Sequence, residues 1–287
     1  MSDTMKGKVV LVTGATAGIG EVTARELARM GARVIGVGRD QHKCADVAAR
    51  IRSTTSSEAV EFMVADLSSQ AQVRRLADEF RRKYTRLDVL VNNAGGFFST
   101  RQESADGIEL TMALNHLNYF LLTHLLLDLL KSSEPSRIVN VSSDAHRNAQ
   151  IDFEDIEAKR KYSGWRMYGQ SKLANVIFTY DLARRLAGTS VTANALHPGF
   201  VATRFGHNNG GMMSAGLKLF QKIAAKPPEQ GAQTSLYLAT SPEVEGVTGK
   251  YFSDQKQVPS SQASYDESAA KRLWAWSEEK TGLLVTA

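Results

Sequence analysis

Cysteine is nearly absent from this 287-residue sequence, which contains one, Cys44. A disulfide bond within the chain needs two thiols, so none can form, and a zinc site built from several thiolates is excluded as well. The histidines show no spacing typical of metal ligands, and we expect no bound metal (His116, His124, His146 and His207). This cysteine usage fits a reducing compartment, so we expect a cytoplasmic protein.

Long hydrophobic runs are also missing. The longest, Tyr119–Leu130, has 12 residues and contains His124 and Asp128, whereas a membrane-spanning helix needs about 20 apolar residues. The first residues, Met1–Val12, show no apolar run of the length that a signal peptide requires. We therefore expect a soluble protein with no membrane partner, and we interpret Tyr119–Leu130 as a buried helix.

Charge of one sign is not in large excess. Lysine and arginine number 35 against 30 acidic residues, a net charge of +5. The basic runs at 74–75 and 81–83 lie among helix-forming residues, which is typical of a solvated helix face. We therefore expect no nucleic-acid partner. The 43% hydrophobic and 23% charged residues are ordinary globular values, and a chain of this length can bury a core as one domain, residues 1–287.

Short β-branched runs alternate with longer helical patterns. The short runs are apolar on both faces, which is typical of buried parallel strands: Lys8–Thr13, Arg33–Gly38, Val60–Val64, Val89–Asn92, Arg137–Val141 and Thr192–His197. Helices are expected between and after them at Gly18–Met30, Gln41–Thr54, Ser69–Lys83, Gly107–Leu130, Met167–Leu186, Pro228–Ala239 and Ser264–Lys280, with a last strand at Lys250–Phe252. This alternation predicts the α/β class, as a single-domain Rossmann-type doubly wound parallel sheet flanked by helices.

Two segments break the alternation. Asn148–Gly164 is polar and charged, has a short helical pattern, and is longer than a simple connection requires. Phe200–Gly216 contains the flexible run Asn208–Gly211, and we interpret it as a lid over a pocket.

A glycine-rich loop joins the first strand directly to the first helix. Thr13–Gly20 reads TGATAGIG, with Gly14, Gly18 and Gly20 as its glycines. Such glycines permit a tight turn and let the first helical amides approach a pyrophosphate. The alternative is a plain turn, but the strand before the loop and the helix after it favour a nucleotide-binding site.

Polar residues also end the third, fourth and fifth strands. Asp66-Leu67 follows the third strand, Asn92–Gly95 ends the fourth, and Ser142-Ser143 ends the fifth. Each group alone is compatible with a turn or a cap. Because the carboxyl ends of parallel strands meet at one edge of the sheet, we expect these residues to lie beside the same crevice.

Tyr168 and Lys172 stand four residues apart in a helical pattern, so their side chains share one face. A tyrosine is a poor acid-base catalyst near neutral pH, because its ordinary pKa is about 10. A neighbouring ammonium group stabilises the phenolate and lowers that pKa. Tyr162 is a rival, but four residues later it has Arg166, which cannot lose its proton.

Together these motifs resemble the short-chain dehydrogenase/reductase family from Lys8 to about Phe252: the glycine loop TGxxxGIG, the NNAG motif, Asn115, the strand-end Ser143 and the YxxxK pair. The resemblance implies that Tyr168 exchanges a proton and that Ser143, rather than Ser142, holds the substrate oxygen. It further implies that Lys172 binds ribose hydroxyls and tunes Tyr168, while Asn115 supports a water relay.

By the same resemblance, an NAD(P) cofactor is expected to contact Gly14, Thr16, Gly18, Ile19, Gly20, Arg39, Asp66, Leu67, Asn93, Ala94, Gly95, Tyr168, Lys172, Pro198, Gly199, Val201 and Thr203.

The end of the second strand predicts the choice of cofactor. In this architecture an acidic residue there accepts hydrogen bonds from a free ribose 2′-hydroxyl. This chain has Gly38 at that place, followed by Arg39, whose guanidinium can grip a 2′-phosphate. We therefore expect NADP(H) to be preferred, with NAD(H) possible. If Asp40 faced the ribose the preference would reverse, but its position favours the start of a helix.

Within the family the sequence resembles the retinol dehydrogenase-like branch, through Arg39-Asp40, Asn115–Leu117, Tyr168–Asn175 and His197–Gly199. We expect interconversion of an apolar carbonyl and its alcohol, because Phe97, Phe98, Trp165, Met212 and Met213 lie on segments expected to border the pocket.

A homodimer is expected through the Tyr119–Leu130 and Val176–Tyr180 faces, with a monomer as the alternative. Other functions considered are a nucleotide-sugar epimerase or dehydratase and a catalytically silent NAD(P) sensor.

Overall fold

The computed structural model describes residues 4–199 and 227–283. The expected lid, Phe200–Gly216 with Met212 and Met213, lies outside the described residues. So do the expected cofactor contacts Val201 and Thr203.

One sheet runs through the molecule, in the strand order β3-β2-β1-β4-β5-β6-β7-β8. Strands β1 to β7 are parallel, and the two-residue β8 pairs antiparallel with β7. Their bounds are Val9–Thr13, Arg33–Gly38, Val60–Val64, Val89–Asn92, Ser136–Val141, Val191–His197, Tyr251–Ser253 and Lys256–Gln257. Each of the expected strands is present within one residue of its expected bounds, and the α/β Rossmann-type fold is confirmed.

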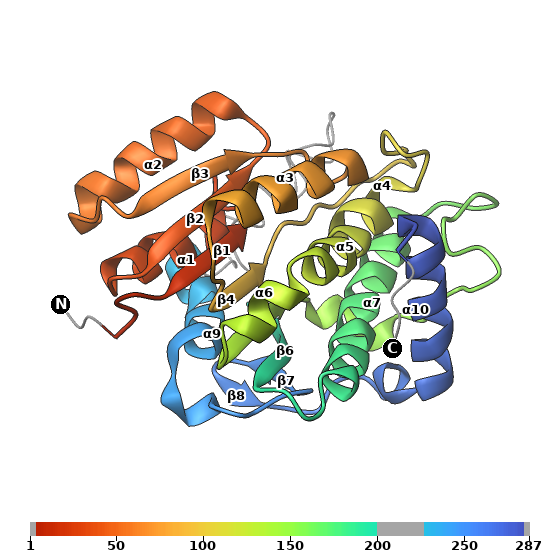
Figure 1. The fold of residues 1–287 in the computed structure, drawn as a ribbon. Helices are drawn as coiled ribbons and strands as arrows, with labels where there is room; N and C mark the ends of the chain where they lie inside the picture. Colours follow the sequence, from red (N-terminus) through yellow and green to blue (C-terminus); the bar gives the residue numbers. More distant parts are fainter. Residues whose placement is uncertain (1–3, 200–226, 284–287) are drawn as a thin grey trace.

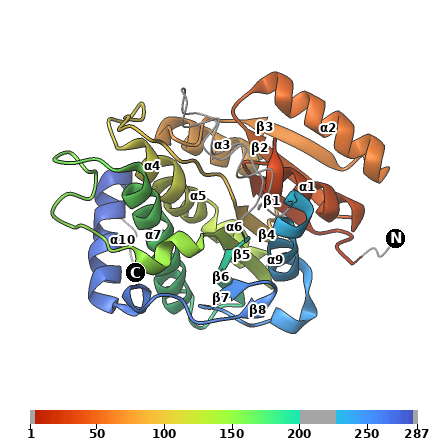
Figure 2. The same ribbon diagram turned by 180° about the vertical axis from the view of Figure 1, so that it is seen from behind.

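Helices cover both faces of the sheet (Figures 1 and 2). On one face lie α1 (Gly18–Arg29), α2 (Gln41–Thr55) and α9 (Pro228–Thr240); on the other lie α3 (Gln70–Lys83), α5 (Asn118–Leu125), α6 (Leu127–Ser132) and α7 (Gly164–Arg185). Each strand contributes side chains to the hydrophobic core on both faces of the sheet, because successive side chains point to opposite faces. Val10 and Val12 pack on the α1 side, and Val9 and Leu11 pack on the α3 side.

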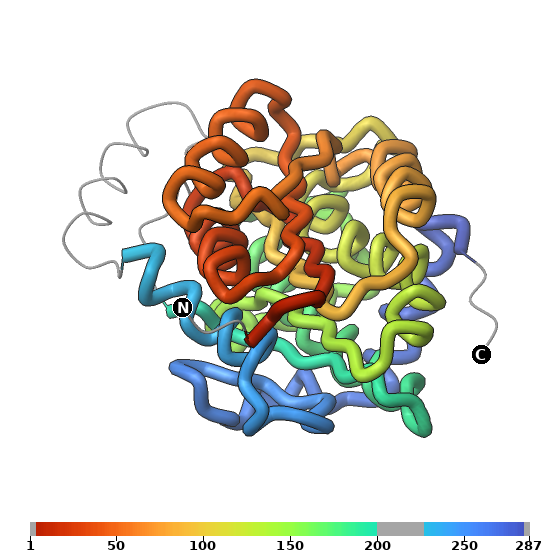
Figure 3. Tube along the Cα trace, turned by 60° about the vertical axis from the view of Figure 1, so that its left-hand side comes forward, coloured from red at the N-terminus to blue at the C-terminus, as the bar shows by residue number. Residues whose placement is uncertain are grey.

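The strand order reverses between β1 and β4. The chain moves outward from β1 to β3 and then returns to the other side of β1 to continue with β4. Figure 3 shows the red and orange N-terminal segments on one side of the molecule and the blue segment around β7 and β8 on the other. In open α/β sheets ligands bind at such a switch point, outside the carboxyl ends of the strands. The fold therefore predicts a ligand-binding site at the loops after β1 and β4.

The long helix expected at Gly107–Leu130 is broken, and that expectation was wrong in its start and its continuity. Helix α4 (Leu110–Met112) begins after Glu109, whose carboxylate accepts hydrogen bonds from two main-chain N–H groups of the first turn. A π turn, η1 (Ala113–Leu117), follows, and then α5 and α6 meet at Leu126. The π turn holds Asn115, whose contacts with residues far along the chain are described below.

Between Asn148, which ends a 3-10 turn, and Gly164, which begins α7, the chain forms no helix, contrary to the short helical pattern expected there. Asp152 Oδ1 accepts hydrogen bonds from the N–H groups of residues 154 and 155, and Asp155 does the same for residues 159 and 160. Side-chain acceptors of this kind compete with helical hydrogen bonds. Gln170 of α7 then anchors the segment, bonding the N–H of Asp152 and the carbonyl of Ile156.

A final helix, α10 (Glu267–Thr281), packs outside α7 (Figure 1). Its Trp274 contacts Phe120 of α5 and Phe178 of α7. Tyr119 and Val176, from the two faces on which the homodimer prediction rested, are fully buried in this single chain. Leu125, Leu127 and Leu129 of the first face are partly exposed, and the homodimer stays a prediction.

No helix within residues 4–199 and 227–283 has the length and apolar character needed to cross a membrane. The same ranges contain no group of three or more metal-ligating side chains placed to hold an ion.

Candidate active site

Hydrogen bonds join the loop after β1 to the loop after β4. Thr13 Oγ1 accepts from the N–H groups of Asn93 (2.8 Å) and Ala94 (3.0 Å), and Asn93 Nδ2 donates to the Thr13 carbonyl (2.8 Å). A Cβ on Gly14 would lie 2.9 Å from Ala94 Cα, and one on Gly20 would lie 2.5 Å from Asn93 Nδ2. Both glycines are therefore required by the close approach of the two loops.

Helix α1 begins inside the glycine loop, at Gly18. Gly14 and Gly18 have φ angles of +65° and +56°, in the left-handed region that favours glycine. The residue before the helix, Ala17, has no polar atom in its side chain with which to cap the first turn. The N–H groups of that turn, which includes Ile19, are therefore suited to bind an anion such as a pyrophosphate.

Tyr168, Lys172 and Ser143 meet where β5 ends. Tyr168 hydrogen bonds with Ser143. Lys172 Nζ donates to the Val141 carbonyl at 3.1 Å and lies 5.7 Å from the centroid of the Tyr168 ring. Ser142 is buried, and its hydroxyl donates to the Lys172 carbonyl at 2.7 Å. Ser143, and not Ser142, is thus the serine that contacts the tyrosine.

Tyr162 lies in a different environment. Its hydroxyl donates to the Phe98 carbonyl at 2.8 Å and lies 3.4 Å from Thr111 Oγ1. Burial raises the pKa of Tyr162, and the nearby Glu109 carboxylate raises it further. Tyr162 thus has structural partners, whereas Tyr168 has the serine and the lysine.

Burial controls the pKa values of the central pair. It raises the pKa of Tyr168 to about 12, and the hydrogen bond with Ser143 acts in the opposite direction. It also lowers the pKa of Lys172 to about 8. Both shifts follow from the cost of placing a charge in a low-dielectric site.

Asn115 joins the π turn to the loop after β4. Its Oδ1 accepts from the N–H of Gly96 at 2.8 Å, and its Nδ2 donates to the Gly96 carbonyl and to Ser171 Oγ, both at 3.0 Å. A Cβ on Gly95 would lie 3.1 Å from Asn115 Oδ1 and 3.5 Å from Lys172 Nζ. The side chains of Asn115 and Lys172 therefore both lie close to Gly95.

Three residues at the end of β2 bear on the expected choice of cofactor. A Cβ on Gly38 would lie 2.4 Å from Thr16 Cγ2 and 2.8 Å from Cys44 Sγ, so no carboxylate-bearing side chain fits there. Arg39 is exposed and forms no hydrogen bond or ion pair within the described ranges. Asp40 is the N-cap of α2, where its side chain accepts from the N–H of the third helical residue at 3.0 Å.

The remaining predicted contacts lie at the same edge of the sheet. Asp66 and Leu67 follow β3, and Asp66 Oδ1 accepts from the N–H (3.0 Å) and the hydroxyl (2.7 Å) of Ser68. Asp66 thus shapes the turn into α3 with one of its carboxylate oxygens. Pro198 and Gly199 directly follow β6, and Gly199 has a φ of +85°.

A row of aromatic rings leads to the catalytic candidates. The ring centroid of Phe97 lies 6.1 Å from that of Tyr168 and 4.6 Å from that of Trp165. Phe97 and Phe98 are buried, whereas Trp165 is 59% exposed. The row therefore connects the surface with the Tyr168 ring.

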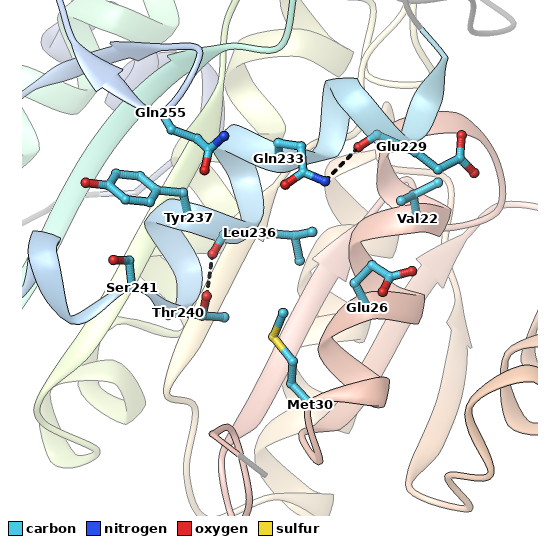
Figure 4. Close-up of a pocket in the computed structure, with 10 residues that line it drawn as sticks. All are labelled: Val22, Glu26, Met30, Glu229, Gln233, Leu236, Tyr237, Thr240, Ser241 and Gln255. Carbon is cyan, nitrogen blue, oxygen red and sulfur yellow. Dashed lines mark hydrogen bonds between the residues drawn. The ribbon is translucent and has the colours of Figure 1, made fainter. Parts of the chain in front are cut away.

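A groove of about 400 Å³ lies elsewhere, between α1 and α9 (Figure 4). It contains none of the predicted site residues, and its carboxylates already have partners. Glu26 pairs with Arg25 and Arg29, and Glu229 pairs with Arg25. The groove carries no constellation that resembles catalytic chemistry.

Three residues that support the site were not predicted. Ser171 and Asn175 bond the side chain and the carbonyl of Asn115, respectively. Their spacing from Tyr168, three and seven residues, puts them on the face of α7 that holds Tyr168, a signal available in the sequence. His146, which bonds the Ser143 carbonyl, belongs to a short 3-10 turn and follows no periodic pattern.

Known proteins resemble this chain over nearly its full length. Residues 8–213 match the model of the short chain dehydrogenase family. Retinol dehydrogenase 14 from Mus musculus is 45% identical, over 98% of this chain and 87% of that protein. A crystal structure of an uncharacterised protein from Mycobacterium Paratuberculosis superposes with a TM-score of 0.79 at 34% identity, covering 98% and 96% of the two chains. The NADP complex of RhlG from Pseudomonas aeruginosa gives 0.71 at 30% identity, covering 88% and 96%.

Fold, site and similarity agree. The chain belongs to the short-chain dehydrogenase family and is an oxidoreductase of that family. Among its relatives are the retinol dehydrogenases, as the sequence motifs predicted.

Proposed function

We propose that the protein reduces an apolar aldehyde or ketone to its alcohol with NADPH. The observation that carries the proposal is the meeting of Tyr168, Ser143 and Lys172 at the end of β5, beside the loops of the switch point. Because the pKa of Tyr168 is about 12, its hydroxyl keeps its proton at neutral pH. A group that holds a proton there is suited to donate it to a carbonyl oxygen, as the reduction requires.

In the proposed mechanism, Ser143 and Tyr168 bind the carbonyl oxygen through their hydroxyls. The hydride would come from the nicotinamide of NADPH when the cofactor is bound. Tyr168 donates its proton to the oxygen as negative charge develops on it, and Lys172, held by the Val141 carbonyl, places positive charge near the ring. Asn115 keeps Gly95 and Gly96 in place beside Lys172. The relay of protons through water at Asn115 stays a prediction.

The cofactor proposed is NADP(H). The loop of Gly14, Gly18 and Gly20 would hold the pyrophosphate at the start of α1. Arg39 would bind the 2′-phosphate, since Gly38 leaves no place for a competing carboxylate and Asp40 is occupied in capping α2. Support also comes from the similar structure of RhlG, which contains NADP.

The proposed substrate is apolar and bulky. Phe97, Trp165 and the Tyr168 ring form a row of apolar surface that suits a conjugated or long-chain carbonyl compound better than a charged keto acid. The relatives named retinol dehydrogenases make retinal a reasonable first compound to test.

The test is consumption of NADPH by the purified protein with a panel of carbonyl compounds. We expect aromatic or long-chain aldehydes, retinal included, to give a much higher kcat/KM than small charged keto acids. If keto acids proved better by a large factor, the substrate class proposed here would be wrong. If no carbonyl compound were reduced, the proposed activity itself would be wrong.

A further inference from the structure

His146 links the candidate catalytic serine to a distant part of the chain. It is fully buried in the 3-10 turn η2 (Asp144–Asn148) that follows Ser143. Its Nδ1 lies 2.7 Å from the Ser143 carbonyl oxygen, and its Nε2 lies 3.1 Å from the main-chain nitrogen of Ser261. One imidazole thus bridges two main-chain groups that are 118 residues apart in sequence.

The two partners define the tautomer of the ring. The main-chain N–H of Ser261 can only donate, so Nε2 must accept and carries no proton. The Ser143 carbonyl can only accept, so Nδ1 must be the protonated nitrogen. Both conditions are met by the neutral Nδ1–H form and by no other form of histidine.

The contact fixes the peptide that carries the serine hydroxyl. The Ser143 carbonyl accepts two hydrogen bonds from His146, one from its Nδ1 and one from its main-chain N–H at 3.1 Å. The Ser143 hydroxyl accepts from the N–H of Ala145 at 3.2 Å and also bonds Tyr168. With the carbonyl and the hydroxyl both held, the serine has little freedom to turn away from Tyr168.

Neighbouring contacts hold the same turn from the C-terminal side. The ring of His146 lies 4.8 Å from that of Tyr251, whose hydroxyl donates to Asp144 at 3.2 Å. Arg147 donates to the Pro259 carbonyl at 3.2 Å and to Asp144 at 3.0 Å. The charged or titratable groups that face His146 are thus Asp144, Arg147, Tyr251 and His197 at the end of β6. Burial lowers the pKa of His146, which keeps the ring neutral.

We propose that His146 is a positioning residue, whose Nδ1–H bond to the Ser143 carbonyl holds the catalytic serine in register with Tyr168. The inference rests on the proposed function, because it assumes that Ser143 binds the substrate oxygen. Its effect falls on the chemical step: a serine displaced by a fraction of an ångström still allows the substrate to bind but stabilises the transition state less.

Two nearly isosteric variants separate the two bonds of the imidazole. His146→Asn keeps an N–H donor at the place of Nδ1 and loses the acceptor for Ser261. His146→Gln keeps an acceptor at the place of Nε2 and loses the donor to Ser143. We expect His146→Gln to lower kcat roughly tenfold or more with little change in KM, and His146→Asn to keep most of the wild-type kcat.

The control is His124→Asn, because the Nδ1 of His124 also contacts a main-chain carbonyl, that of Phe120 at 2.6 Å, on α5. It should leave kcat unchanged. Equal kcat values in His146→Gln and His146→Asn would show that the bond to Ser143 does not position the serine, and would overturn the proposal.

A measurement without turnover keeps the inference separate from the proposed function. Long-range ¹H–¹⁵N NMR spectra of the labelled wild-type protein report which imidazole nitrogen carries the proton. We expect His146 in the Nδ1–H form at neutral pH. A ring protonated on Nε2 would overturn the positioning role even in an active enzyme, whereas an inactive wild type with the Nδ1–H ring would refute the activity and leave the link to Ser143 standing.

Discussion

At the scale of single residues, the proposed chemistry depends on two side chains whose pKa values are shifted in opposite directions by burial. Burial raises the pKa of Tyr168 to about 12 and lowers that of Lys172 to about 8. Tyr168 therefore keeps its proton at neutral pH, and Lys172 is mostly protonated there although burial has lowered its pKa. The Tyr168 hydroxyl can therefore donate a proton. Its hydrogen bond with Ser143 keeps it beside the place where the substrate oxygen is expected.

Removal of the Tyr168 hydroxyl should abolish turnover and leave the fold intact. In Tyr168→Phe the ring remains in contact with Phe97, but no proton can be exchanged. We expect kcat to fall by at least about 10²-fold, with NADPH binding unchanged in a fluorescence titration. The matched control is Tyr162→Phe, whose hydroxyl bonds the Phe98 carbonyl and should affect stability more than kcat. An active Tyr168→Phe beside an inactive Tyr162→Phe would show that the wrong tyrosine was chosen.

The choice of cofactor should depend on Arg39. We expect Arg39→Ala to lower kcat/KM for NADPH by roughly ten- to a hundredfold, because a charge-assisted bond to the 2′-phosphate contributes about 1.5–3 kcal/mol. The value for NADH should change little, since its ribose carries no phosphate. Wild-type enzyme that uses NADH as well as NADPH, or an Arg39→Ala variant that loses nothing with NADPH, would contradict the assignment.

At the scale of elements, the strands were predictable and parts of the helices were not. A buried parallel strand is a short, continuous apolar run rich in β-branched residues, so β2 and β4 could be placed to the residue. The bounds of β3 were also predicted, but β3 is an edge strand in which only Val60 is buried, so the expectation that it is buried on both faces was wrong. The break in the helix around Asn115 depends on Gly96 and Asn175, which lie 19 and 60 residues away in sequence. No local pattern contains that information.

The same reasoning applies to the surroundings of the site. The glycine loop and the pair Tyr168 and Lys172 could be recognised because their spacing within one element defines their geometry. The turns at 148–164 follow from acceptors on Asp152 and Asp155, which a helical hydrophobic pattern does not register. Likewise, the apolar residues of α5 and α7 indicated a buried face but not that α10 covers it.

The cover formed by α10 should contribute to stability and not to catalysis. Trp274 is 5% exposed, packs on Phe120, and has the guanidinium of Arg185 3.7 Å above its ring. We expect Trp274→Ala to lower the free energy of unfolding by about 3–5 kcal/mol, measured by urea denaturation.

Trp165→Ala is the matched control, because Trp165 is 59% exposed at the open end of the aromatic row. It should change stability by no more than about 0.5 kcal/mol and should raise KM for bulky apolar aldehydes. If the two variants exchanged these effects, the roles assigned to α10 and to the aromatic row would be wrong.

At the scale of the whole molecule, buried histidines make stability depend on pH. Burial lowers the pKa of His116 to about 4, and it also lowers the pKa of His124 and His146. In the unfolded chain these histidines take up protons below the ordinary histidine pKa of about 6.5, whereas in the folded chain they do so only at lower pH. Stability is therefore fully present above pH 6.5 and is lost as the pH falls from there toward 4.

We expect the free energy of unfolding to fall by about 2 kcal/mol from pH 7 to pH 5 because His116 takes up a proton only in the unfolded chain. Urea denaturation at the two pH values measures the change, and His116→Asn should show a smaller one by about that amount. A wild type equally stable at both values would mean that the imidazole, bonded to Ser277 at 2.9 Å, is not held neutral in the fold.

We propose that a nicotinamide and a carbonyl carbon meet at Tyr168 for direct hydride transfer. The measurement that tests it most directly uses NADPH with deuterium at the transferred C4 position and an apolar aldehyde such as retinal, with the alcohol analysed by mass spectrometry. We expect one deuterium on the carbinol carbon of each product molecule, and almost no labelled alcohol from Tyr168→Phe. An alcohol without the label, or no alcohol from any carbonyl compound offered, would contradict it.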